Sequence, residues 1–436
     1  MATTNKDYVI PEGQPELGIG PAWLQDKRAA LKDSFNSIEL PKRGLQLWRY
    51  TDPGEFMFEP QGNGSDAVEE VGTVEALEKK HLEQGLISAL VVDRGGRKIE
   101  FNGLDALASK GVLIQPLTQA AEQNFDMIGS RFYELVNSNT GKFEAMNGAL
   151  WQEGIFIYVP RGTTVEAPVH LLRKAGAAGS TQHFRLLVLV EENAEFTLID
   201  EYGGGSSDLD NQSFSSGMVE LFAGRDSRVR YVSLQRQEEG SRFYLTHRAQ
   251  IDSGAQMLTI PLAFGGLLSK QNFGVVLNGS GANSRMYGML FGSAKQHFDN
   301  HTLHHHAAGS TYSDIDFKVV LRDKALSAYT GLIRIEQDAT NCEAYQENRN
   351  LVLTPGARAE TIPELEILNE EVSCSHGATV GPVDPLQEFY LRCRGIHEQD
   401  ARRMIVSGFV TPTLDQVPDD LRARIAEFVA SRLESI

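Results

Sequence analysis

Cysteine is scarce in this chain, and the few cysteines that occur are widely spaced. Among 436 residues there are three, Cys342, Cys374 and Cys393, and no Cys-x-x-Cys pair. A low, odd count argues against a disulfide framework and predicts a reducing compartment, the cytoplasm. Because an iron–sulfur cluster usually takes four protein thiolates, we expect the chain alone to hold no stable cluster, although it can donate one or two ligands to a site completed elsewhere.

Other absences exclude whole classes of function. No apolar run approaches the roughly 18–20 residues that span a bilayer. Residues 1–20 predict neither a secretory signal nor a transit peptide. The chain has no Gly-x-x-x-x-Gly-Lys-Ser/Thr, Gly-x-Ser-x-Gly or His-Glu-x-x-His motif, which argues against nucleotide hydrolysis, serine hydrolysis and zinc proteolysis. The formal charge of −17 repels phosphate backbones and anionic lipid, so we expect no nucleic-acid partner and no membrane partner.

The composition that is present, 41% apolar and 23% charged, is that of a globular protein. Residues 1–149 predict a mixed α/β region. A helical pattern opens at Pro21 and closes at Pro41, residues 87–101 predict a β-hairpin, and residues 118–137 predict one helix. Residues 54–75, rich in Gly, Asp and Glu, predict irregular structure.

From about residue 150, short strands with period-two alternation replace the helical patterns. Turn signatures recur, each followed by a small residue, at positions 163, 194, 227, 255, 282, 325 and 357. A strand-only period near 30 residues predicts a β-solenoid, whose coils cover one another's faces, with an antiparallel β-sandwich as the alternative. The one long interval, from 282 to 325, predicts an insertion of about 12 residues.

Helical patterns return at residue 384. Asp384-Pro385 predicts a helix start, with an N-cap and a proline at the first helical position, and Gly395 predicts its end. An apolar stripe over residues 401–409 predicts a second helix, and a third is expected from Asp419 to about Leu433. We therefore expect three parts: residues 1–149, a β core over residues 150–383, and a helical region over residues 384–436.

The strongest local signal for chemistry is Cys374 with His376. Two residues apart on a strand, they share one face. A thiolate and an imidazole suit iron or zinc. The alternative is a buried structural cysteine beside a hydrogen-bonded histidine. We expect the other two cysteines, Cys342 and Cys393, to be packed in the core rather than to bind metal.

A second signal is the histidine-rich segment 299–306, Asp-Asn-His-Thr-Leu-His-His-His. In a strand, His304 and His306 would share a face and His305 would oppose them. Neutral imidazoles bind iron, zinc and copper, so a metal site is one interpretation. The alternative is a solvated turn inside the predicted insertion. A cupin-type oxygenase would need a further histidine one or two strands on, and the next one, His376, lies farther along the chain.

Several segments together resemble the SufD branch of the SufB/SufD family of iron–sulfur cluster assembly proteins. The octapeptide at 374–381, Cys-Ser-His-Gly-Ala-Thr-Val-Gly, carries most of this resemblance. Gly377 after His376, and the lack of cysteine in residues 348–353, favour SufD over SufB. Order and spacing agree along nearly the whole chain, through residues 362–367, 389–396 and 401–409, and more weakly through residues 47–51 and 142–147.

The resemblance implies a right-handed parallel β-helix core flanked by helical regions. It implies a non-catalytic scaffold that pairs with SufB through the β-helix, or with a second copy of itself when alone, and that docks the ATPase SufC, two copies per complex, on the carboxy-terminal helices. It implies that Cys374 and His376 share iron or a transient cluster with SufB, and His306 matches a family histidine. The contact residues for the ATPase would be Phe389, Tyr390, Arg392, Arg394, Gly395 and Met404.

Two other functions stay open at this point. A SufB-type scaffold is the close alternative, because residues 343–348 resemble both branches. A β-helix enzyme acting on acidic polysaccharide is the more distant one, and the acidic charge and the missing signal peptide count against it.

Overall fold

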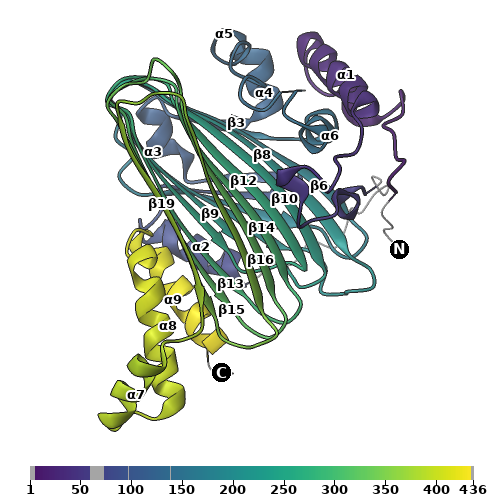
Figure 1. The fold of residues 1–436 in the computed structure, drawn as a ribbon. Coiled ribbons are helices and arrows are strands. Elements are labelled where there is room, and N and C mark those ends of the chain that lie inside the picture. The colour runs from purple at the N-terminus through teal and green to yellow at the C-terminus, as the bar shows by residue number, and fades with distance from the viewer. Residues whose placement is uncertain (1–4, 59–72, 97, 138, 434–436) are drawn as a thin grey trace.

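The structure is a computed structural model, and it describes residues 5–58, 73–96, 98–137 and 139–433. Its body is a β-solenoid in which two sheets face each other (Figure 1). Within these residues the first sheet has the order β19-β17-β15-β13-β11-β9-β7-β5-β1-β2 and the second has the order β18-β16-β14-β12-β10-β8-β6-β4-β3. Only β1–β2 and β3–β4 are antiparallel pairs in this part of the chain. The predicted β-solenoid is confirmed, and the β-sandwich alternative is wrong.

The strands of the solenoid alternate between the two sheets along the chain. The first sheet holds β1 (Ala89–Arg94), β2 (Lys98–Asn102), β5 (Val169–Ala175), β7 (Glu195–Gly204), β9 (Arg228–Gln235), β11 (Gln256–Ala263), β13 (Asn283–Gly292), β15 (Tyr312–Leu321), β17 (Cys342–Val352) and β19 (Val372–Gly381). The second sheet holds β3 (Leu113–Pro116), β4 (Ile155–Val159), β6 (Thr181–Val190), β8 (Ser213–Ala223), β10 (Ser241–Ile251), β12 (Leu268–Leu277), β14 (His297–His306), β16 (Leu326–Ile335) and β18 (Arg358–Ile367).

Left-handed turn residues mark the corners of the coils. Asn193, Asp226, Gly254 and Gly281 have φ between 55° and 78°, which Asn, Asp and Gly tolerate better than other residues. Each stands directly before one of the small residues at 194, 227, 255 and 282, all of which are buried. The recurring signature in the sequence therefore corresponds to a corner at which one coil lies on the next.

The predicted insertion between residues 282 and 325 is wrong. Ala282 precedes β13 in the first sheet, whereas Ala325 precedes β16 in the second sheet. The longer interval is one and a half coils, because the small-residue marker moves from one sheet to the other. The histidine-rich segment is accordingly the core strand β14 and not a solvated turn.

Most of the amino-terminal helices lie on the outer face of the second sheet, whereas the helix over residues 73–83 packs on β1 and β5 of the first sheet (Figure 1). Their packing buries Leu24, Phe35 and Phe143 against side chains of the sheet such as Phe214 and Tyr244. The elements before the solenoid are η1 (Pro15–Gly18), α1 (Ala22–Ser37), η2 (Gln46–Trp48), η3 (Pro53–Phe56), α2 (Thr73–Glu83), α3 (Leu104–Ser109), α4 (Leu117–Gln123), α5 (Phe125–Ile128) and α6 (Lys142–Leu150).

Several predictions for residues 1–149 can be compared with these elements. The helix after Pro21 and the hairpin, β1 with β2, are confirmed. The single helix at 118–137 is wrong, because Asn124, with φ −126° and ψ 34°, breaks it into α4 and α5. Of the segment predicted to be irregular, residues 59–72 lie outside the described residues, and α2 begins at Thr73.

The carboxy-terminal helices are α7 (Pro385–Cys393), α8 (Glu398–Leu414) and α9 (Asp419–Leu433), as the sequence predicts. Val410 of α8 and Ile425 of α9 pack on the outer face of the first sheet, whereas α7 buries no residue and projects from the body (Figure 1). None of the helices in the described ranges combines the length and the apolar composition needed to cross a bilayer.

Candidate metal and partner site at the open end of the solenoid

The last coil of the solenoid has no neighbour beyond it. Among the described residues, β18 pairs only with β16 and β19 pairs only with β17, so both strands are sheet edges. The apolar side chains of this coil are uncovered: Val380 is 50% exposed, and Ile367 and Leu368 are also exposed. An edge of this kind is a surface to which another chain can add a strand or a face.

Cys374 and His376 lie on β19 and point toward the inside of this last coil. In the register of β17 with β19, Cys374 stands opposite Ala344 and His376 opposite Gln346, and both of those residues are buried. Because side chains at opposed positions share a face, the pair faces inward. The spacing predicts that the two side chains share a face, and the register shows which face it is. Cys374 is half-buried and His376 is exposed, since no further coil covers them.

The Cys374 thiol is not activated by its surroundings. Burial raises its pKa, and the neighbouring Cys342 adds to this effect. The thiol is therefore protonated at neutral pH, and it becomes a strong ligand only when a cation or a partner's positive charge comes close. His376 offers an exposed imidazole two residues along. Together they provide one sulfur and one nitrogen donor, which is half of a tetrahedral set.

Cys342 and His306 lie deeper in the solenoid behind this pair. Cys342 is buried, as predicted, and its Sγ lies 3.2 Å from Thr311 Oγ1. His306 hydrogen-bonds through Nδ1 to Thr311 Oγ1 at 2.7 Å and through Nε2 to Ser313 Oγ at 2.8 Å. Burial lowers the pKa of His306 to about 4, so the imidazole is neutral. To bind metal, His306 would have to give up one of these bonds, and its role as a ligand stays a prediction.

The other histidines of β14 alternate as the sequence predicts. His304 is buried with His306, and its Nε2 lies 3.0 Å from Ser284 Oγ. His305 lies on the opposite face, with Nε2 2.8 Å from Glu336 Oε1. His301 also faces outward and pairs with Asp299 at 2.7 Å. His301 Nε2 also lies 2.8 Å from Lys270 Nζ, so the histidines of this strand have separate partners and the strand does not gather them at one point.

The carboxy-terminal helices present the residues predicted to contact a partner. Phe389, Tyr390 and Met404 are all more than half exposed. Arg394 stacks on the Tyr390 ring and donates to its hydroxyl at 3.1 Å. Arg392 pairs with two glutamates, Glu388 and Glu398, at 3.8 and 3.5 Å, and Gly395, with φ 87°, turns the chain from α7 into α8.

The prediction that Cys393 is packed in the core is wrong. Cys393 is exposed, because α7 contacts α8, for example through Glu388 and Arg402, without burying any of its own residues.

Two family descriptions match this chain in adjacent segments. "SUF system FeS cluster assembly, SufBD core domain" matches residues 172–409, and "SufBD protein N-terminal region" matches residues 86–171. The chain belongs to the SufBD family. A SufBD protein acts in iron–sulfur cluster assembly, and the core match covers both the open end and the exposed part of α7 and α8.

Individual SufBD relatives match nearly the full chain. The iron-sulfur cluster assembly protein SufB of Bacillus subtilis is 25% identical over 420 residues, which cover 95% of this chain and 90% of that protein. A SufBD family protein of Synechocystis is 27% identical over 430 residues, which cover 95% of this chain and 92% of that protein. A SufBD family protein of Staphylococcus saprophyticus is 25% identical over 420 residues, which cover 95% of this chain and 90% of that protein. The matched family is one of cluster assembly and lends no support to a polysaccharide enzyme or a cupin-type oxygenase, and the solenoid fold also differs from the β-sandwich that a cupin needs.

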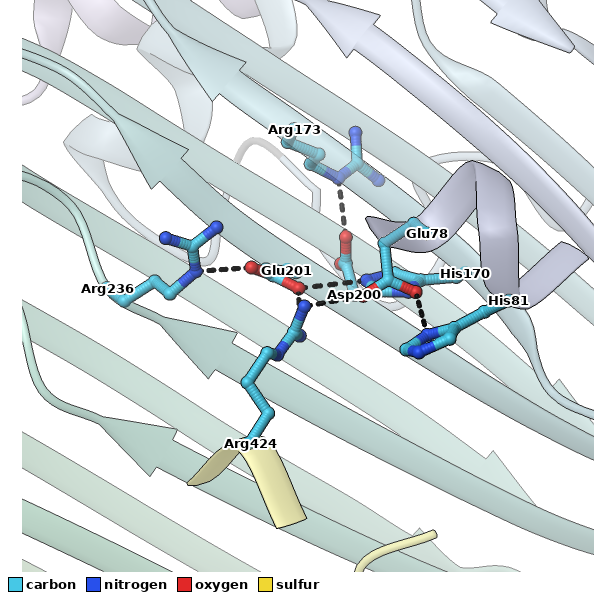
Figure 2. A network of polar contacts seen from close by, with 8 residues as sticks. All are labelled: Glu78, His81, His170, Arg173, Asp200, Glu201, Arg236 and Arg424. Carbon is cyan, nitrogen blue, oxygen red and sulfur yellow. Dashed lines mark hydrogen bonds and ion pairs between the residues drawn. The ribbon is translucent and has the colours of Figure 1, made fainter. Parts of the chain in front are cut away.

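This SufBD chain also holds a buried charged cluster that the sequence analysis missed (Figure 2). His170 of β5 lies between two carboxylates, with Nδ1 2.9 Å from Glu78 Oε2 and Nε2 3.0 Å from Glu201 Oε2. Arg424 of α9 bridges the same two glutamates, and Arg236 pairs with Glu201. The cluster joins α2, β5, β7 and α9. The one signal in the sequence is that His170 and Glu201, polar residues in apolar strands, are 31 residues apart, about one coil.

The charges of this cluster reinforce each other. Burial by itself would lower the pKa of His170, but the carboxylates of Glu201 and Glu78 raise it to about 9, so the ring is an imidazolium at neutral pH. Burial would raise the pKa of Glu201, yet Arg424, Arg236 and His170 outweigh it and hold that pKa well below its usual range. The pKa of Glu78 is lowered in the same way.

Proposed function

We propose that this chain is the SufD-type scaffold subunit of the SUF assembly complex, and that its open end pairs with a SufB-type partner around iron or a nascent cluster. The observation that carries this proposal is the position of Cys374 and His376. Both face the inside of a terminal coil that no described segment covers. Iron or the cluster is the cargo of the pair and not a resident cofactor.

The donor count supports a shared site. Cys374 and His376 supply two ligands, and a cluster usually takes four. The residues that stand opposite the pair on β17, Ala344 and Gln346, add no thiolate or carboxylate, and the neighbouring thiol of Cys342 is buried and hydrogen-bonded to Thr311. A partner that covers the exposed Val380 would bring its own donors to the same edge and would exclude water from the cargo.

The sequence around the pair favours SufD over SufB. Gly377 follows His376 where the resemblance gives SufB a glutamate. Residues 348–353 contain no cysteine, and the cysteine of β17 is the buried Cys342 at the start of that strand. The resemblance implies that SufB carries its key cysteine one strand before the one with the histidine, in the segment that corresponds to residues 348–353 here. The relatives named above include a SufB protein, so a SufB-type role is the alternative that the experiment must exclude.

The exposed face of α7 and α8 supports docking of an ATPase of the SufC type. Phe389, Tyr390 and Met404 are exposed apolar side chains on α7 and α8, and α8 packs on the solenoid. Val406 and Val410 of α8 lie on the outer face of the first sheet, the sheet whose last strand is β19. A pull on α7 would therefore be transmitted to the sheet that carries Cys374 and His376. We expect the chain to have no turnover of its own.

The test is anaerobic co-purification with SufB and SufC, followed by measurement of iron, sulfide and cluster transfer. We expect His376→Ala to lower the rate of cluster maturation at least tenfold while the complex still forms, and Cys374→Ser to lower it less. His305→Ala and Cys393→Ser are matched controls, because both side chains are accessible but lie away from the last coil. A His376→Ala complex that matures clusters at the wild-type rate would remove the proposed role of this residue.

A second arm separates the SufD from the SufB role. If the chain forms a complex with a SufB partner and SufC, and the partner's cysteines are needed for sulfide uptake, the SufD-type role is supported. If it assembles clusters with SufC and a SufD-type partner instead, the SufB-type role replaces it.

A further inference from the structure

The buried cluster of Glu78, His170 and Glu201 has the donor set of a metal site. One nitrogen or oxygen atom from each residue can be chosen so that all three lie within 4.8 Å of one another. Two carboxylates with one imidazole suit divalent iron, cobalt, zinc or manganese, and the site contains no sulfur. The three side chains are at most 2% exposed and come from three elements, α2, β5 and β7, that the fold holds in place.

The described arrangement already contains the contacts that support a metal-bound histidine. Metal-ligating histidines usually donate their second ring N–H to a carboxylate. His170 faces a carboxylate at each of its two nitrogens, so either nitrogen can bind an ion while the other keeps its hydrogen bond. At whichever nitrogen binds the ion, the adjacent glutamate oxygen lies 2.9 or 3.0 Å away, close to the separation of about 3.3 Å between two ligands of a tetrahedral ion. The other glutamate has to move toward that ion, into the space that the Arg424 guanidinium now occupies.

A cation already stands between the two glutamates. The Arg424 guanidinium donates to Glu78 Oε1 and, at 2.6 Å, to Glu201 Oε2, which is the oxygen that also accepts from His170 (Figure 2). The Arg424 side chain is 20% exposed, whereas both glutamates are almost fully buried. A rotation of this one side chain would open a path to solvent and leave two buried carboxylates in need of another cation.

We propose that Glu78, His170 and Glu201 form a sulfur-free site for a divalent transition-metal ion, closed by the Arg424 side chain. The ion takes one oxygen of each glutamate and one nitrogen of His170, and it replaces the guanidinium between the carboxylates. His81, whose Nδ1 lies 3.2 Å from Glu78 Oε2, is placed to act as a fourth donor. The site is distinct from the open end, since its ligands belong to α2 and the first coils of the solenoid.

The test uses Co²⁺ alone as the probe on the full-length chain. All variants carry Cys374→Ser and His376→Ala, so that the open end does not contribute. We expect Arg424→Ala to bind one Co²⁺ at least tenfold more tightly than the same chain with Arg424 in place. Its visible spectrum should show cobalt d–d bands and no thiolate-to-cobalt charge-transfer band. Zn²⁺ should displace the Co²⁺ from this site.

Matched variants decide whether the triad is responsible. Adding Glu201→Gln or His170→Gln to Arg424→Ala should weaken Co²⁺ binding at least tenfold, with folding checked by circular dichroism and gel filtration. Arg422→Ala removes a nearby arginine of α9 that pairs with Asp415 and Asp419, and it should leave Co²⁺ affinity unchanged. The proposal is overturned if Arg424→Ala gains no affinity, or if its Co²⁺ survives both triad substitutions. In that case the cluster is a structural ion-pair network only.

Discussion

The two ends of the solenoid differ in whether their edge strands are covered. At its start, β1 lies beside β5 and is itself covered by the antiparallel β2, while β3 runs antiparallel to β4. At its end, β18 and β19 have no further strand beside them in the described chain. The start therefore protects its own edge, as isolated sheets must, and the end leaves an edge for association.

Polar groups follow the same division. Near the start, Glu78, His170 and Glu201 are buried and each has a charged partner. At the end, Cys374 and His376 face an interior that no described coil covers. The chain itself therefore completes the polar contacts of the cluster near the start, whereas the end presents two metal ligands, Cys374 and His376, that another chain can complete.

The largest effect is expected from a charge buried at the start of the solenoid. Val91 on β1 is fully buried in the inner core against β5. Val91→Asp places an unpaired carboxylate there, and we expect a loss of about 3–5 kcal/mol in the free energy of unfolding. Urea unfolding followed by circular dichroism measures it. A loss below about 1 kcal/mol would mean that the first coil is not closed in solution.

The pH dependence of the ion cluster is the second test. The pKa of His170 is raised to about 9 in the folded state from 6.5. Its stabilisation is therefore fully present below pH 6.5 and is lost as the pH rises through 9. With a chelator present, we expect the free energy of unfolding of the wild type to be higher than that of His170→Gln by on the order of 3 kcal/mol near pH 6. Near pH 9.5 the difference should be much smaller, and urea unfolding at each pH measures it.

The control for this test is an exposed position. Cys393→Ser, on α7, should follow the wild-type curve at every pH. A gap between wild type and His170→Gln that stays constant from pH 6 to pH 9.5 would contradict the assignment of His170 as an imidazolium.

Much of the fold follows from local pattern. The corners at Ala194, Ser227 and Ala255 are predictable because a left-handed residue and a small residue recur once per coil. The interval from Ala282 to Ala325 is misinterpreted because corners of both sheets carry the same marker, and sequence alone does not say to which sheet a corner belongs. Similarly, the break at Asn124 is set by packing rather than by apolar periodicity.

Some residues of the candidate sites are also predictable from local pattern, and others are not. That Cys374 and His376 share a face follows from strand periodicity, so the sequence is enough to predict it, whereas the inward direction of that face comes from the pairing of β19 with β17. The Glu78–His170–Glu201 cluster is not predictable in this way, because its members lie 92 and 31 residues apart and meet only when α2 docks on the solenoid. The exposure of Cys393 is equally a tertiary effect, because α7 meets α8 without burying any of its own residues.

The third prediction applies the substitution used at Val91 to the open end. Val380 on β19 is half exposed, so Val380→Asp should change the free energy of unfolding of the isolated chain by less than about 0.5 kcal/mol. In the complex it would bury a charge in an apolar contact. We expect affinity for the SufB-type partner to fall at least tenfold, about 1.4 kcal/mol, by calorimetry. Unchanged affinity would place the partner elsewhere.

The smallest expected effect lies at a coil corner of the closed part. Asn193 has φ 57°, a left-handed conformation that costs an alanine roughly 1 kcal/mol. Asn193→Ala should therefore lower the free energy of unfolding by about 1 kcal/mol, whereas Asn193→Gly, which tolerates this conformation, should lower it by less. Asn341, with φ 55°, occupies the matching corner before β17, one coil from the open end. Asn341→Ala should cost about the same in the isolated chain, and the cost should grow in the complex if the partner's contacts order that last corner.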